Sequence, residues 1–298
     1  MRRKVFPIVL TVFLITLVLF AAGYTAEGKG GQIDSSAGGR QTIENSKMPE
    51  APGTVEYRGE DAAIDASNVS QGYVMVKYTG SADKVRIRVT LPNGTATNYP
   101  FEKGSYHAIP LSGGSGNYTI VVYAHISGNS YSIALSQNIS AKLENEFGPF
   151  LYPNQYVEYT NGSMCVRCGR EISDESDDDF DYMTNVFNYV TENIKYDKEM
   201  AANIPVNYLP DPDRTMETKK GICFDYVSLM TAMLRSQGIP AKLEVGYSGN
   251  NYHAWIRVYL NGQWINEIID PTLAASNDRE SARKYMENEN NYVLMYEY

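Results

Sequence analysis

The chain has 298 residues with 26 basic and 35 acidic side chains, a net charge of −9, and three cysteines. This length is enough for about two domains, each with its own hydrophobic core. An acidic chain repels phosphate backbones, so we expect no nucleic-acid partner. Three cysteines are too few for a protein built on a disulfide framework.

The N-terminal segment predicts export from the cytoplasm. Arg2, Arg3 and Lys4 precede the uncharged residues 5–26, which contain an apolar run of 19 residues. A basic start, an apolar run and small residues are typical of a secretory signal, although this run is also nearly long enough to span a bilayer. We therefore expect residues 1–26 to be a signal peptide or an N-terminal membrane anchor. In either case the protein would be extracytoplasmic, secreted or anchored to the membrane.

The next two segments predict a linker and an all-β region. Residues 27–53 are rich in glycine and polar residues, which is typical of a flexible linker. In residues 54–143, short alternating or β-branched runs are divided by Gly, Asn, Pro and Ser clusters at the spacing of a β-sandwich. We expect residues 54–143 to form a sandwich-like domain that acts as a spacer or binding module, with His107 and His125 as packing or surface residues.

From residue 144 to residue 298 the pattern is that of an α+β domain. Seven acidic residues between Glu171 and Asp181 lack the ligand spacing of a calcium loop. They are better placed to stabilise the N-terminus of a helix, whose apolar residues from Phe180 to Ile194 recur at helical spacing.

A second helix is expected to begin at Cys223 and to end at Gly238, because Pro240 cannot continue it. In the first turn of a helix, unpaired N–H groups and the helix dipole favour a thiolate. A cysteine in a helix is usually structural, so this position alone does not identify a nucleophile.

Three strand-like runs follow this helix, at residues 241–247, 251–260 and 263–270. Asn261 and Gly262 predict a two-residue type I′ turn between the last two runs. With that turn, His253 lies directly opposite Asp270 on one face of the hairpin. A carboxylate in this place orients a histidine and stabilises its charge. If the Cys223 helix packs on this sheet, the three residues form a Cys–His–Asp triad for acyl transfer.

The runs GICFDYVSLMTAMLRSQGIPAKLEVGY and YHAWIRVYLNGQWINEIIDPT closely resemble the transglutaminase-like superfamily. The resemblance covers about residues 178–273 and implies a papain-like α+β core, with a Cys-containing helix packed on an antiparallel sheet. It further implies Cys223 as nucleophile, His253 as base and Asp270 as the residue that orients the base. The reaction would pass through a thioester acyl-enzyme, released by water in a peptidase or amidase and by an amine in a crosslinking enzyme.

One spacing departs from the family pattern. The family usually has a step of four residues from the tryptophan after the hairpin to the aspartate, whereas Trp264 and Asp270 are six residues apart. Asp270 keeps its Pro-Thr neighbours and is our predicted third member of the triad. Glu267 is the alternative if a bulge or a longer strand brings it nearer to the histidine.

An oxyanion also needs hydrogen-bond donors. The backbone N–H of Cys223 is the expected first donor, and Tyr208 and Tyr196 are among the candidates for a second. We expect Trp255 and Trp264 to be packing or cleft-wall residues rather than catalytic ones.

The two other cysteines, Cys165 and Cys168, form a CxxC pair. Because the chain has three cysteines, an oxidising compartment favours a local disulfide between these two, which leaves Cys223 free. Unpaired structural thiols remain an alternative, as do a zinc site, which would need further ligands, and a redox centre, which would need a βαβ unit.

These observations predict a cysteine-dependent acyltransferase or protease that acts on protein or peptide amides, cell-envelope peptides included. We expect no cofactor and no metal ion, and contact with the membrane through the N-terminal segment if that segment stays uncleaved. Two other readings stay open. One is a non-catalytic binding or scaffold protein that retains the fold, and the other is a redox protein whose activity would survive Cys223→Ala. We expect residues 292–298 to add a final strand.

Overall fold

The computed structural model describes residues 39–298 of the chain. The predicted signal or anchor, residues 1–26, and the first part of the predicted linker lie outside the described residues. Among residues 39–298, no helix is both long and apolar enough to cross a membrane.

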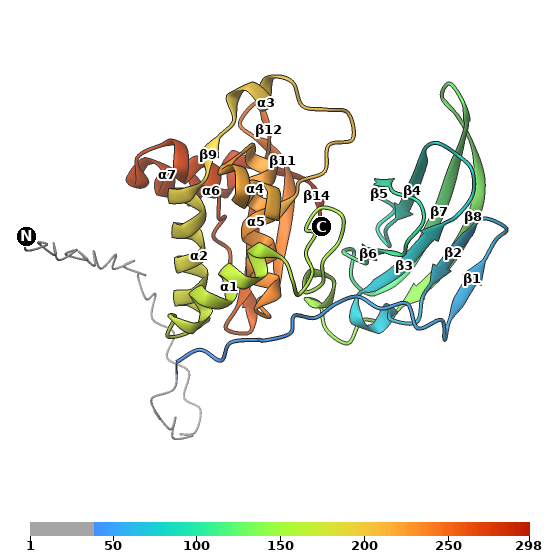
Figure 1. The fold of residues 1–298 in the computed structure, drawn as a ribbon, viewed down its shortest axis with the longest axis horizontal. Coiled ribbons are helices and arrows are strands. Elements are labelled where there is room, and N and C mark those ends of the chain that lie inside the picture. The colour runs from blue at the N-terminus through green and yellow to red at the C-terminus, as the bar shows by residue number, and fades with distance from the viewer. Residues whose placement is uncertain (1–38) are drawn as a thin grey trace, which may run out of the picture. The chain divides into compact units, whose positions relative to one another are not determined.

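Residues 56–141 form two antiparallel sheets of four strands each (Figure 1). The strands are β1 (Glu56–Arg58), β2 (Ala62–Asp65), β3 (Tyr73–Tyr78), β4 (Val85–Thr90), β5 (Ala96–Phe101), β6 (His107–Pro110), β7 (Gly116–Ser127) and β8 (Ser130–Ala141). The strand orders are β1-β2-β3-β6 and β5-β4-β7-β8.

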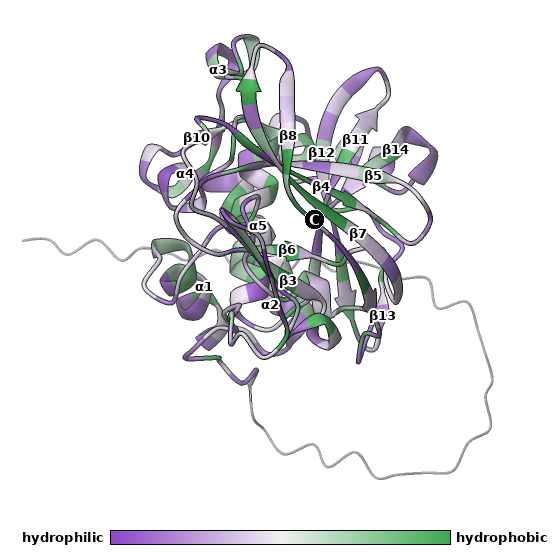
Figure 2. Cartoon of the chain, turned by 90° about the vertical axis from the view of Figure 1, so that its right-hand side faces the viewer, coloured by the Kyte–Doolittle hydropathy of each residue, from purple (hydrophilic) through white to green (hydrophobic). Residues whose placement is uncertain are grey.

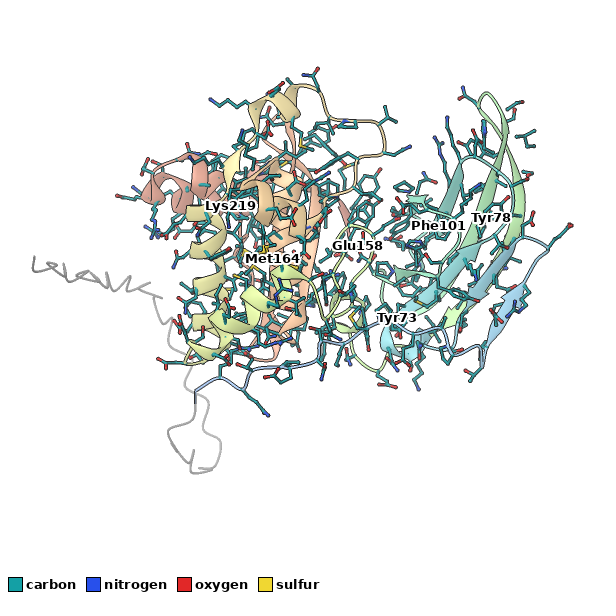
Figure 3. All side chains as sticks on the ribbon, in the orientation of Figure 1. Tyr73, Tyr78, Phe101, Glu158, Met164 and Lys219 are labelled. Carbon is teal, nitrogen blue, oxygen red and sulfur yellow. The ribbon has the colours of Figure 1, made fainter. Side chains whose placement is uncertain are left out.

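Alternation of apolar and polar residues explains how these two sheets pack. In β4 the apolar Val85, Ile87 and Val89 are buried, while Arg86 and Arg88 are exposed. Figure 2 shows the apolar stretches of these strands in green, and Figure 3 shows Tyr73 and Tyr78 at the two ends of β3. An antiparallel sheet with one apolar face buries that face against a second sheet. This confirms the predicted all-β region before the α+β region.

The rest of the chain is an α+β region, as predicted. Its helices are α1 (Met164–Asp174), α2 (Asp179–Asn193), α3 (Lys198–Ala202), α4 (Pro212–Thr218), α5 (Cys223–Ser236), α6 (Pro271–Ser276) and α7 (Arg279–Met286). Its strands are β9 (Lys195–Tyr196), β10 (Lys220–Gly221), β11 (Ala241–Ser248), β12 (Asn251–Leu260), β13 (Gln263–Trp264) and β14 (Tyr292–Glu297). The last four form an antiparallel sheet of order β13-β12-β11-β14, so the predicted final strand is confirmed.

Helix α5 is the central helix of this region. It packs on α1 and α2 on one side and on β11 and β12 on the other, and nearly all of its side chains are buried. A helix that is buried on all sides lies in the core of its domain. Gly238 ends it with a φ of 78°, and the Ile239 N–H bonds to the carbonyl of Leu234 at 3.0 Å. Both predicted helices are confirmed, and Asp178 caps α2 by accepting the N–H of Asp181.

The hairpin of β12 and β13 differs from the prediction beyond its turn. Asn261 and Gly262 have φ values of 52° and 82°, as a type I′ turn requires. The ladder keeps the predicted register through Trp264 and then stops. It resumes with the pair Ile256 and Ile269, which is offset by two residues from the predicted register. The predicted strand 263–270 is therefore wrong, and Asp270 does not lie directly opposite His253.

Arg257 holds the irregular segment that causes this offset. Its guanidinium donates to the backbone carbonyls of Ile265, at 3.4 Å, and Asn266, at 3.0 Å. The extra residues between Trp264 and Asp270 are accommodated here, because the chain leaves the ladder after β13 and returns to it at Ile269.

The described part of the predicted linker, residues 39–53, makes an ion pair and hydrogen bonds to the rest of the chain. Residues 39–53 contain no helix or strand, but Arg40 forms an ion pair with Asp179 at 2.8 Å. The backbone of Ile43 exchanges two hydrogen bonds with the amide side chain of Gln237, at 2.9 and 3.0 Å. Residues 40–43 thus lie along the helical region, whereas the N–H groups of Glu50 and Gly53 bond to Tyr73 and Asp65 of the sandwich.

Candidate active site

Cys223 is the first residue of α5, and a buried carboxylate fixes the start of this helix. Asp225, which is 1% exposed, accepts the N–H of Ile222 at 2.8 Å and the hydroxyl of Tyr208 at 2.5 Å. Within residues 39–298, the N–H groups of Cys223 and Phe224 have no hydrogen-bond partner. A developing oxyanion could bind to these two donors.

His253 and Asp270 are in direct contact despite the altered register. The Nε2 atom of His253 lies 2.7 Å from Oδ2 of Asp270. Asp270 is fully buried and is the N-cap of α6, where its Oδ1 accepts the N–H of Leu273 at 2.9 Å. The helix start therefore fixes the carboxylate that holds the imidazole. Glu267, the predicted alternative, is exposed.

The surroundings of His253 favour its charged form. Burial alone would lower the pKa of this imidazole, but hydrogen bonds to Asp270 and Cys223 and the charges of both outweigh burial and raise its pKa from 6.5 to about 10. Opposite charges and hydrogen bonds to the charged form act in this direction. Since Nε2 is bonded to Asp270, the other ring nitrogen remains for Cys223. A thiol in contact with an imidazolium is activated as a nucleophile.

The two tyrosines considered as second oxyanion donors differ in their availability. The hydroxyl of Tyr208 donates to Asp225 and also contacts Arg214. Tyr196 lies beside the start of α5 and hence near Cys223, because β9 pairs with β10 through Tyr196 and Gly221. Burial raises the pKa of Tyr196, and the charge of Cys223 raises it further. Of the two, Tyr196 is the better-placed candidate.

Sequence reasoning missed Tyr292, the first residue of β14. Its hydroxyl donates to Oδ2 of Asp270 at 3.1 Å, so this oxygen serves both His253 and Tyr292. Burial and the charge of Asp270 raise the pKa of Tyr292 well above its usual range. The sequence predicts a final strand here, but it carries no signal for the strand's neighbour in the sheet.

The remaining aromatic and histidine candidates are packing residues. Trp255 is buried and donates its Nε1 to Glu244 at 2.5 Å. Trp264 packs edge-on against Phe150. The other two histidines lie in the sandwich: His107 begins β6, and His125, in β7, contacts Asp83 at 2.7 Å.

The expected disulfide between Cys165 and Cys168 is not formed. Both are free thiols on α1. Cys165 is buried beside Asp213, which caps the helix by accepting the N–H groups of Met164 and Cys165. Burial raises the pKa of both thiols. The number of cysteines in a sequence cannot show that Cys165 is buried in the core.

No group of three or more His, Cys, Asp or Glu side chains within residues 39–298 is placed to hold a metal ion.

Comparison with known proteins agrees with this geometry. Residues 167–267 match the family model of the Transglutaminase-like superfamily. This part of the chain belongs to that superfamily. The matched segment contains Cys223 and His253, whereas Asp270 lies just beyond it. The contact between Asp270 and His253 is therefore known from the structure and not from the family match.

Individual relatives of this transglutaminase-like domain are distant. The protein YebA of Bacillus subtilis is 26% identical over 192 residues, 54% of this chain and 24% of YebA. The protein MJ1282 of Methanocaldococcus jannaschii is 31% identical over 98 residues, 29% of this chain and 27% of that protein. The matched segments thus span about a quarter of these curated relatives. A solved structure, red sea bream transglutaminase, covers 70% of this chain and 49% of its own at 11% identity, with a TM-score of 0.33.

Proposed function

We propose that the protein is a cysteine-dependent acyltransferase or protease that acts on protein or peptide amides. One observation carries the proposal: the imidazole of His253 is held at 2.7 Å by the buried carboxylate of Asp270, and Cys223 lies near enough to help raise the pKa of the imidazole. A nucleophile, a base and a group that orients the base are the parts that acyl transfer through a cysteine requires.

In the first half-reaction, the Cys223 thiolate attacks the amide carbonyl carbon, and a C–S bond forms. The carbonyl oxygen becomes an oxyanion, which the N–H groups of Cys223 and Phe224 can bind. The protonated His253 then donates its proton to the amide nitrogen as the C–N bond breaks, which releases the amine and leaves a thioester.

In the second half-reaction, the now neutral His253 takes a proton from water or from an amine. The activated acceptor attacks the thioester, and the Cys223 thiolate leaves. Water gives hydrolysis, and an amine gives transamidation. Throughout both steps Asp270 keeps the imidazole oriented and stabilises its positive form.

We also propose that this activity takes place outside the cytoplasm, since residues 1–26 have the composition of a signal or anchor. Substrates of that compartment, cell-envelope peptides included, would then be within reach. Fractionation of cells that express the full-length chain tests this part, and recovery in the cytosol would contradict it.

The reaction itself is tested with dimethylated casein and a fluorescent primary amine, using the purified full-length chain. Release of peptides reports hydrolysis, and covalent incorporation of the amine reports transamidation. We expect Cys223→Ala to reduce the observed activity by about a thousandfold or more. Cys168→Ala removes another partly buried thiol and should retain the activity. Activity that survives Cys223→Ala and is lost in Cys168→Ala would contradict the proposal and favour a redox protein.

A further inference from the structure

Three exposed apolar side chains lie near the end of the sheet where Cys223 is found. Only residues 237–240 separate α5 from β11, and α5 packs on both β11 and β12. β11 therefore runs back along α5. Its last residues and the first residues of β12 lie at the N-terminal end of that helix, beside the nucleophile.

Side chains alternate between the two faces of a strand. The three exposed side chains therefore lie on the same face of the sheet as the residues that pack against α5. Val245 of β11 and Ala254 of β12 belong to the core that includes α5, so Tyr247 and Tyr252, two residues away, face the same side. Tyr247 and Tyr252 are paired across the strands, with ring centroids 5.6 Å apart. Val293 of β14 pairs with Tyr247 and lies on the same face. We call Tyr247, Tyr252 and Val293 the apolar wall.

The apolar wall is exposed and uncharged. Tyr247, Val293 and Tyr252 are 43%, 56% and 61% exposed, respectively. Residues 246–256 and 290–296, which carry the wall, contain no Asp, Glu, Lys or Arg. Neighbouring apolar side chains that stay in contact with water are typical of a binding surface.

The wall borders the candidate active site. Tyr252 directly precedes His253 in β12, so the two side chains leave the strand on opposite faces, and the wall approaches the site from the side of Cys223. The pKa of Tyr252 is raised first by burial, and the charges of Tyr296, Tyr247 and Cys223 add to this shift. A substrate carbonyl bound at Cys223 would present its neighbouring side chain to this surface.

We propose that the apolar wall binds the side chain next to the reacting carbonyl of the acyl donor and selects apolar side chains over polar ones. This inference rests on the function proposed above, because it assigns a substrate class to the same site. The occupant is an aliphatic or aromatic side chain of a peptide, since the wall offers aromatic and aliphatic surface and its strand segments carry no Asp, Glu, Lys or Arg.

Two peptidyl chloromethyl ketones test the proposal on the full-length chain. They differ only in the side chain beside the reactive ketone, which is leucine in one and glutamine in the other. Both are uncharged, so the negative charge of the protein favours neither. The rate of Cys223 alkylation by each probe is divided by the rate with iodoacetamide for the same protein, which corrects for changes in the nucleophile itself.

In the wild type we expect the leucine probe to react about tenfold faster than the glutamine probe, the size of a hydrophobic side-chain selection. Tyr252→Ser and Val293→Ser should each reduce this ratio to about threefold or less. Ile126→Ser is the matched control, because Ile126 is an equally exposed apolar residue of β7 in the sandwich, and it should keep the wild-type ratio.

Equal rates for the two probes in the wild type would overturn the proposal, and so would a leucine preference that survives both wall substitutions. In either case labelling of Cys223 by iodoacetamide would leave the proposed function standing. If His253→Ala left the iodoacetamide rate unchanged, the proposed function would fail, and the assignment of the wall would fail with it.

Discussion

At the scale of single residues, the carboxylate of Asp270 is held by three hydrogen-bond partners. Its carboxylate accepts hydrogen bonds from His253, Tyr292 and the N–H of Leu273 while it is fully buried. A buried carboxylate needs such partners to stay charged. The charge in turn raises the pKa of His253. Since that pKa lies above its value in the unfolded chain, protonation of His253 stabilises the fold fully below about pH 6.5. This contribution is lost as the pH rises toward 10.

Asp270→Asn should lower the pKa of His253. The amide has no negative charge to stabilise the imidazolium, so we expect the titration midpoint of His253 to fall by about 1–3 pH units. NMR titration of the imidazole C–H signals measures it, with the signal of His253 assigned through His253→Ala. The signals of His107 and His125, which lie in the sandwich, serve as internal controls and should be the same in both proteins. An unchanged midpoint for His253 would contradict the geometry described for the pair.

Tyr292→Phe should remove one of the donors to Asp270 without leaving a cavity. We expect a loss of about 1 kcal/mol in the free energy of unfolding, the usual size of one hydrogen bond, and a several-fold slower alkylation of Cys223. Urea denaturation and the alkylation rate are the two measurements. Tyr285→Phe is the matched control, since the Tyr285 hydroxyl bonds to Ser248 and not to Asp270. Equal effects of the two substitutions on alkylation would show that Tyr292 has no special role.

At the scale of elements, the start of α5 positions Cys223. Asp225 joins Ile222, at the beginning of the helix, to Tyr208 of the preceding loop. If this carboxylate is removed, a buried N–H and a hydroxyl lose their acceptor. The first turn of α5, which carries Cys223, then loses its anchor.

Asp225→Ala should destabilise the protein by about 1–3 kcal/mol, the cost of unpaired buried polar groups. It should also slow alkylation of Cys223, because the helix start is no longer fixed. Asp225→Asn keeps one acceptor oxygen and should lie between Asp225→Ala and the wild type in both measurements. Denaturant midpoints and alkylation rates that match the wild type in Asp225→Ala would refute this role.

Among these elements, the turn and the helix start can be predicted from the sequence, whereas the strand register cannot. The type I′ turn at Asn261 and Gly262 and the helix that begins at Cys223 follow from local signals, and both are found. The register beyond Trp264 does not follow from local signals, because Arg257 fixes the irregular segment through contacts to its backbone. A shift of two residues keeps every side chain on its face. This is why Asp270 still meets His253 although their predicted direct pairing is wrong.

At the scale of the whole molecule, one aromatic cluster joins the sandwich to the α+β region. Tyr99 of β5 lies 5.8 Å from Tyr156 and 5.7 Å from Tyr298, measured between ring centroids. All three tyrosines are buried and belong to one continuous core. Such contacts depend on residues far apart in sequence, and composition and periodicity carry no signal for them.

Because this core is shared, residues 39–298 should unfold in a single transition. Tyr99→Ala should destabilise that transition as a whole, by about 3–5 kcal/mol, the cost of truncating a large buried aromatic side chain. Calorimetry and tyrosine fluorescence follow the unfolding. Ile133→Ala, a change at an exposed residue of β8, should have little effect. Two separate transitions in the wild type, only one of them sensitive to Tyr99→Ala, would contradict a shared core.

The central claim, that His253 activates Cys223, is tested most directly by the pH dependence of iodoacetamide alkylation at Cys223, measured by peptide mass spectrometry. A charged imidazole beside the thiol predicts faster reaction of Cys223 in the wild type than in His253→Ala, with free glutathione as the reference thiol. In His253→Ala the rate should instead follow that of an ordinary thiol, whose pKa is about 8.5. A wild-type Cys223 that reacts like an ordinary thiol, with no change in His253→Ala, would contradict the account.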